Sequence, residues 1–229
     1  MPTQSRTTES RPQIRRLDPA DLDAVVDLSL LAWEPVFTSF EQILGATIFD
    51  KVYRPHWRTA QAESVRTNCL ATGAETFVMA TTSGDVVGFL VLMQDQEESL
   101  GVIEMIAVHP RHQRRGHGRG LMEFAIQRLR DQGLTLINVG TGGDPGHAPA
   151  RALYEAVGFT GVPLVSYYLA TDEDSAAPRR PTGTGWTDNS SHGHDRRTQA
   201  GPSGGQLNRD RPTGHGPGGV VPGVVPLRS

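Results

Sequence analysis

An abrupt change of pattern near the middle of the chain restricts its fold more than any other feature. Residues 101–108, GVIEMIAV, are almost entirely apolar and predict a strand inside a sheet. Residues 109–121, HPRHQRRGHGRGL, then gather arginine, histidine and glycine, and LMEFAIQRLRDQG from residue 121 onward has apolar residues at helical spacing. A strand, a basic glycine-rich joint and a helix follow one another, which indicates an α/β fold.

The joint at 109–121 has the residue types of a pyrophosphate site. A helix that begins there presents unpaired backbone N–H groups and a partial positive charge, glycines let a phosphate approach the backbone, and arginines add charge-assisted contacts. The dinucleotide pattern G-x-G-x-x-G fails, because Leu121 stands where the third glycine belongs. The P-loop pattern also fails, because no Lys-Ser/Thr pair follows the glycines.

Residues 12–170 read as one domain with the order β-α-α-β-β-β-α-β-α-β. The first helix has Asp18 as its N-cap and Pro19 at its first position, and Gly45 and Pro55 interrupt the next helical stretch. Strands are expected at 13–17, in a hairpin over 75–94, and at 100–108, 134–141 and 162–170. Helices are expected at 18–33, 118–133 and 148–158, and an interrupted helical stretch is expected over 39–70.

Both ends of the chain are predicted to be disordered, over residues 1–11 and 171–229. The second stretch is dense in glycine and proline and poor in apolar clusters, so it buries too little surface to offset its chain entropy. The run HGHD at 192–195 therefore favours a solvated tail over a metal site, and no metal is expected.

Composition excludes several classes of protein. The formal net charge of −3 argues against a dedicated nucleic-acid binder, so no nucleic-acid partner is expected. Cys69 is the single cysteine, which excludes an intramolecular disulfide framework and a cysteine-rich zinc site. No apolar run approaches the roughly 18 residues that span a bilayer, and the N-terminus has no apolar leader. We expect a soluble cytoplasmic protein with no membrane partner.

Three sequence motifs together resemble the GNAT superfamily of N-acetyltransferases. The first is Gln113-x-x-Gly116-x-Gly118, the acetyl-CoA pyrophosphate loop of that family, preceded by IEMIAVHP. The second is ARALYEAVGF at 150–159, and the third, a looser match, is the opening IRRLDPADLDAV. The resemblance implies an α/β fold with a mixed central sheet flanked by helices, in which two central strands splay apart to hold acetyl-CoA.

The resemblance also implies where the coenzyme lies. The backbone of Ile106, Ala107 and Val108 would pair with the pantetheine arm, and the Val108 N–H would face the thioester carbonyl as the oxyanion donor. The pyrophosphate loop would comprise Gln113, Arg114, Arg115, Gly116, His117, Gly118 and Arg119, while Gly120 would let the helix lie close to the sheet. His147 stands where many members have an asparagine that contacts the coenzyme; its ring offers a similar hydrogen-bond donor, and the alternative is a loop residue with no such contact.

Acetyl transfer to an amine needs a base for the ammonium and an acid for the departing thiolate. Glu104 is the candidate base, because it stands alone among apolar residues on a predicted central strand, where burial would raise its pKa. The alternative is an ion pair with an arginine at the sheet face. Tyr154 is the candidate acid, since the resemblance directs this tyrosine to the coenzyme sulfur; the alternative is a core aromatic residue.

The acceptor is less well specified by the sequence. Aromatic residues and carboxylates in 29–60 (Trp33, Phe37, Phe40, Trp57, Glu34, Glu41 and Asp50) suit a cationic amine, but amphipathic helices contain the same residues. We expect direct transfer, through a ternary complex, to a primary amine of a small molecule. A protein or peptide amine, a non-catalytic acyl-CoA-binding module and nucleic-acid binding through the arginine cluster are the alternatives, and a homodimer is left open.

Overall fold

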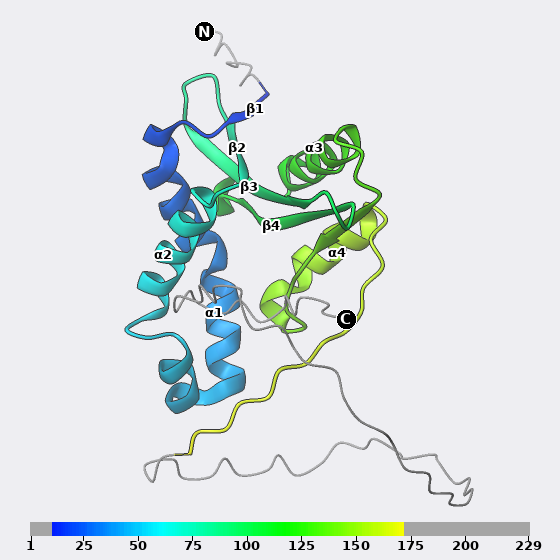
Figure 1. Cartoon of the computed structure of the whole chain (residues 1–229). Coiled ribbons are helices and arrows are strands. Elements are labelled where there is room, and N and C mark those ends of the chain that lie inside the picture. Colours follow the sequence, from blue (N-terminus) through cyan, green and yellow to red (C-terminus); the bar gives the residue numbers. More distant parts are fainter. Residues whose placement is uncertain (1–10, 172–229) are drawn as a thin grey trace, which may run out of the picture. The chain divides into compact units, whose positions relative to one another are not determined.

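The computed structural model describes residues 11–171 (Figure 1). The expectations of disorder at 1–11 and 171–229 therefore fall, apart from residues 11 and 171, outside the described residues, and so does the run at 192–195. Within 11–171, none of the helices combines the length and apolar character needed to cross a membrane.

A five-stranded mixed sheet forms the centre of the fold. The strands are β1 (Gln13–Arg16), β2 (Glu75–Ala80), β3 (Val86–Asp95), β4 (Leu100–Val108) and β5 (Leu136–Val139), and they lie side by side in that order. The pairings from β1 to β4 are antiparallel, and β4 pairs with β5 in parallel. The predicted hairpin is β2–β3, and the apolar strand β4 is internal, as expected.

Within residues 11–171, four α-helices and three short 3₁₀ helices accompany the strands. The α-helices are α1 (Leu22–Val52), α2 (Trp57–Cys69), α3 (His117–Asp131) and α4 (Ala148–Ala156); the 3₁₀ helices are η1 (Pro19–Asp21), η2 (Pro110–His112) and η3 (Pro145–His147). Asp18 caps η1 as predicted, and its capping-box partner is Asp21. The first helix is longer than expected and includes Pro35, but it is broken at Gly45, where φ is 73°.

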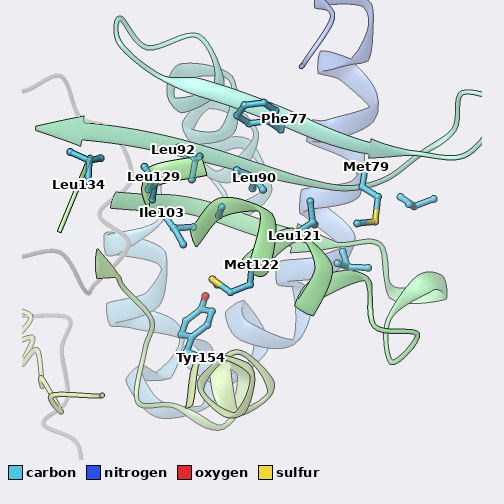
Figure 2. Packing of buried hydrophobic residues seen from close by; sticks show 13 residues of the cluster. Phe77, Met79, Leu90, Leu92, Ile103, Leu121, Met122, Leu129, Leu134 and Tyr154 are labelled. Carbon is cyan, nitrogen blue, oxygen red and sulfur yellow. The ribbon is translucent and has the colours of Figure 1, made fainter. Parts of the chain in front are cut away.

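Apolar side chains cover both faces of the sheet. On one face α3 and α4 pack over a cluster that contains Leu90, Ile103, Met122 and Tyr154 (Figure 2). On the other face α1 and α2 pack over a cluster around Phe89, whose side chain is completely buried. The result is a helix–sheet–helix arrangement with the sheet as the middle layer.

The prediction of a strand at 162–170 is wrong. These residues form no strand, and their large side chains are exposed, with Val162 at 78% and Tyr167 at 91%. Their composition favours an extended chain, but a strand also needs a hydrogen-bonding neighbour. Among the described residues nothing pairs with the outer edge of β5, so the sheet ends there.

Candidate active site

A β-bulge interrupts the pairing of β3 and β4 at Glu104. Val91 of β3 pairs with Met105, and its neighbour Leu92 pairs with Ile103, so Glu104 is the extra residue of β4. Ile103 packs in the cluster under α3 and α4, whereas Met105 packs in the cluster under α1 and α2. The bulge therefore reverses which face each later residue of β4 occupies.

The strands β4 and β5 separate just where this bulge occurs. Their last paired residues are Ile103 and Val139, although β4 continues to Val108. Residues 104–108 consequently have no strand beside them on the β5 side within the described chain. Because β5 itself ends at Val139, this edge of β4 is open, as the predicted splay of the central strands would require.

The backbone of Val108 faces this opening. His109 N–H donates to the Val87 carbonyl of β3 over 2.9 Å, and Val108 lies opposite Gly88. In an antiparallel pair hydrogen-bonded and non-hydrogen-bonded positions alternate, so the N–H of Val108 points away from β3. The same alternation directs the backbone N–H and carbonyl of Ile106 toward the opening and the N–H of Ala107 toward β3.

The basic glycine-rich loop lies between the end of β4 and the start of α3. Gly116 is the N-cap of α3, with φ at 84°, and Gln113 Nε2 donates to the Val108 carbonyl over 3.0 Å. A Cβ on Gly118 would lie 3.4 Å from Leu153 of α4 and 3.9 Å from Val108. The loop, the end of β4 and the middle of α4 therefore converge.

The loop is electropositive. Arg114 and Arg115 are exposed, while Arg119 pairs with Glu123 over 2.8 Å one turn along α3. Burial and the neighbouring positive charges, among them Arg115, hold the pKa of His117 below its usual range. Because α3 begins here, its free backbone N–H groups add to this positive potential, and the arrangement suits an anionic ligand.

Tyr154 and Glu104 have different surroundings. The Tyr154 side chain is buried, and burial raises the pKa of its hydroxyl to about 12. Figure 2 shows that hydroxyl directed at the sheet beside Met122, and no group of residues 11–171 hydrogen-bonds it.

Glu104 is an exposed residue, but its carboxyl is partly desolvated, and this desolvation raises its pKa. Within 11–171 no arginine forms an ion pair with Glu104, so the structure does not favour the ion-pair alternative.

His147 lies at the start of α4, in contact with α1. Its Nδ1 is 2.5 Å from Oδ1 of Asp144, and its ring centroid is 5.6 Å from that of Phe40. Both members of the pair are buried. Asp144 was not expected from the sequence, although an Asp and a His three residues apart before a predicted helix were a usable signal.

The aromatic residues expected near the acceptor pack mainly against one another. Phe37 stacks on Trp57 with ring centroids 4.4 Å apart, and Arg58 covers Trp57. Glu34 pairs with Arg58 over 2.5 Å. These contacts join α1 to α2, so the amphipathic-helix alternative accounts for most of these residues. Within residues 11–171 no three His, Cys, Asp or Glu side chains gather as metal ligands would.

Comparison with known proteins gives a consistent result. Residues 42–159 match the model of the acetyltransferase (GNAT) family. No curated protein sequence matches the chain. A GNAT-family acetyltransferase structure from Staphylococcus aureus is 15% identical and aligns over 70% of this chain and 94% of its own, with a TM-score of 0.51.

Two further structures have lower TM-scores. A GNAT-family protein from Desulfovibrio desulfuricans, described as a putative acetyltransferase, is 22% identical over 65% of this chain and 85% of its own, with a TM-score of 0.48. The PaiA N-acetyltransferase from Thermoplasma acidophilum, in complex with coenzyme A, is 12% identical over 65% of this chain and 89% of its own, with a TM-score of 0.47.

Proposed function

The chain belongs to the GNAT acetyltransferase family and is an acyltransferase, and on this premise we propose that it transfers the acetyl group of acetyl-CoA to a primary amine of a small molecule. The observation that carries the proposal is the convergence of three features: the open edge of β4 after the bulge at Glu104, the glycine-rich loop at the start of α3, and the buried hydroxyl of Tyr154. Together they offer a donor site and the groups that the transfer needs.

The loop would hold the coenzyme pyrophosphate. The backbone N–H groups around Gly116 and Gly118 supply hydrogen bonds, and Arg114 and Arg115 supply charge. The pantetheine arm would then run along the open edge of β4, where Ile106 and Val108 direct their backbone groups. Placed there, the Val108 N–H faces the thioester carbonyl and stabilises the oxyanion that forms on attack.

Tyr154 and Glu104 would perform the proton transfers. The high pKa of Tyr154 keeps its hydroxyl protonated at neutral pH, so it can give a proton to the coenzyme thiolate as that group leaves. The raised pKa of Glu104 makes its carboxylate a stronger base than an ordinary one. The amine attacks the thioester directly in a ternary complex, and no acetyl-enzyme is formed.

Thiol release from acetyl-CoA tests the proposal on the full chain. The acceptors are spermidine, kanamycin A, L-lysine and a tetrapeptide with a free N-terminal alanine, so that small-molecule and peptide amines compete. We expect turnover with a small amine, and Tyr154→Phe should lower kcat by roughly 10- to 10⁴-fold while acetyl-CoA still binds. Tyr167→Phe is the matched control, because Tyr167 is 91% exposed.

Three results would count against the proposal. Preferred turnover of the peptide would move the substrate to the protein class. Tight acetyl-CoA binding without turnover of any amine would indicate a non-catalytic module. Undiminished turnover by Tyr154→Phe would remove Tyr154 from the mechanism. Gly118→Val separates a coenzyme site from a nucleic-acid site, because the added side chain would block the loop between Leu153 and Val108 yet leave the arginines in place.

A further inference from the structure

The Asp144–His147 pair is held more rigidly than a loop between a strand and a helix requires. Arg151 of α4 donates to the carbonyls of Gly142 over 2.5 Å and of Asp144 over 2.8 Å. A Cβ on Gly142 would lie 2.4 Å from Asp144 Oδ1, and one on Gly146 would lie 2.6 Å from the α1 backbone. Two glycines and an arginine thus fix the distance between the carboxylate and the imidazole.

The hydrogen bond to Asp144 sets the tautomer of His147. Burial opposes ionisation of Asp144, but the hydrogen bond and charge of His147, with the nearby Ser39 hydroxyl and Gly146 N–H, keep the pKa of its carboxyl below the usual range. An ionised carboxylate only accepts hydrogen bonds, so when the imidazole of His147 is neutral, Nδ1 carries its proton and Nε2 has a free lone pair. The resemblance implied that His147 could donate a hydrogen bond in place of the asparagine. Neutral His147 has no proton on Nε2, so it cannot donate a hydrogen bond from that atom.

Nε2 is also available to a ligand. It makes no hydrogen bond within residues 11–171, and it is not among the completely buried unpaired polar atoms of that range, which are Gln61 Nε2, Thr141 Oγ1 and Asp144 Oδ2. The ring lies against Phe40 of α1, which limits the water around it. A buried aspartate that orients a histidine with one free nitrogen is an arrangement suited to general-base catalysis.

His147 and Tyr154, the acid of the proposed reaction, belong to one continuous helical segment. His147 immediately precedes α4, and Tyr154 lies seven residues later. Seven residues are nearly two helical turns, so the two side chains leave the same face, about 10 Å apart along the axis. Side chains of this length can reach one substrate from both ends, directly or through one water.

The proton balance of acetyl transfer calls for a second acceptor. An ammonium substrate loses two protons from nitrogen as it becomes an amide, whereas the leaving thiolate takes up one, so the reaction releases one proton. Glu104 can hold only one of the two at a time. Tyr154 gives its proton to the thiolate and must then be reprotonated, through water, by one of the two protons that leave the nitrogen.

We propose that His147 is a second proton acceptor for the acceptor amine, through its Nε2 and directly or through one water, and that Asp144 is its positioning residue. The inference rests on the proposed function. In each turnover the amine nitrogen forms its bond to the acetyl carbon, the carbon–sulfur bond breaks, and Glu104 and His147 each take one proton. One of these protons replaces that of Tyr154 through water, and the other leaves to the solvent.

His147→Asn separates this role from a coenzyme contact. Asparagine keeps a hydrogen-bond donor for the coenzyme but cannot accept the proton. We expect His147→Asn to lower kcat about 10²-fold or more, while its affinity for acetyl-CoA stays within about twofold of that of the unaltered chain. Asp144→Asn should lower kcat by a smaller factor and shift the acidic limb of the kcat/KM pH profile. Free imidazole should restore part of the activity of His147→Ala.

Side-chain ¹⁵N NMR of the full chain gives a readout independent of turnover. The resonances of His147, identified by their absence in His147→Asn, should show the Nδ1–H tautomer, and Asp144→Asn should abolish that preference. If the unaltered chain is active on one of the four amines but His147→Asn keeps its kcat, this inference is wrong and the proposed function stands. If the unaltered chain acetylates none of them, both are wrong. An Nε2–H tautomer for His147 also overturns the inference.

Discussion

The side-chain amide of Gln113 donates a hydrogen bond to the backbone carbonyl of Val108 over 3.0 Å. This bond joins the first residue of the glycine motif to the last residue of β4. Since Val108 directs its N–H and its carbonyl to the same open side of the strand, the bond fixes the loop beside the groups proposed to hold the pantetheine arm. The sequence motif and the open edge of β4 are thus held next to each other, as the proposed coenzyme site requires.

Gln113→Ala should weaken acetyl-CoA binding. A neutral hydrogen bond of this kind contributes about 0.5–1.5 kcal/mol, so the Kd should rise about 2- to 12-fold, while kcat at saturating coenzyme changes little. Isothermal titration calorimetry measures the Kd. Gln127→Ala, which removes a comparable amide on the exposed side of α3, is the control. Equal affinities for Gln113→Ala and the unaltered chain would show that the loop needs no such support.

Gly116 of the loop and Gly120 of α3 should respond to alanine in opposite directions. Gly116 has φ at 84°, a conformation that costs other residues about 1 kcal/mol or more, so Gly116→Ala should lower the free energy of unfolding. Gly120 is inside α3, and a Cβ there meets only Met79 Cε at 3.8 Å, an ordinary contact. Close packing therefore does not require Gly120, contrary to expectation, and Gly120→Ala should stabilise the chain by about 0.5–1 kcal/mol. Urea denaturation measures both changes, and a destabilised Gly120→Ala would contradict this explanation.

Features set by neighbouring residues were predictable from sequence. The cap at Asp18, the β2–β3 hairpin and the end of α3 near Gly133 depend on local residue preferences, and the structure has them as expected. The bulge at Glu104 was not predictable, because it depends on the register between two strands. Its apolar neighbours indicated an unusual carboxylate but gave no reason for its position.

The remaining differences arise from long-range contacts. The stretch 162–170 is apolar on both faces, a pattern typical of internal strands, but the described residues provide no strand beside it. The spacing of Asp144 and His147 is visible in the sequence, but the burial of Asp144 beside α1 depends on the folded structure. Local patterns therefore predicted the loop before α3, which is the proposed donor site, whereas the burial of Asp144 and the missing partner of 162–170 became visible only in the folded structure.

Glu75 should stabilise the fold in a pH-dependent way. Arg128 of α3 binds its carboxylate through two hydrogen bonds of 2.8 and 2.9 Å, and Arg16 of β1 adds one of 2.8 Å, which lowers the pKa of Glu75 to about 2. Because the folded pKa is below the unfolded one, this stabilisation is present above about pH 4.5 and is lost as the pH falls toward 2.

Glu75→Gln should consequently lower the free energy of unfolding by about 1–3 kcal/mol at pH 7, and the deficit should shrink between pH 4.5 and 2. Chemical denaturation at several pH values measures it. Glu98→Gln, which changes an exposed carboxyl in the turn between β3 and β4, should have almost no effect. A deficit that is the same at pH 7 and pH 2.5 would mean that charge is not its cause.

Glu104→Gln should improve stability and impair turnover at the same time. Desolvation raises the pKa of Glu104, so the fold favours its neutral form, and the unaltered chain loses stability as the pH rises through that pKa. Base catalysis needs the charged form, so activity should rise over the same pH range. Glu104→Gln should therefore have a higher Tm at pH 7 than the unaltered chain, and this difference should vanish in acid. Its kcat should be lower, and its pH–rate profile should lack the acidic limb that Glu104 causes.

Calorimetry and pH–rate profiles test this, with Glu97→Gln, which changes an exposed carboxyl beyond β3, as the control. A lower Tm at pH 7, or an unchanged kcat, would show that the bulge does not hold a catalytic base.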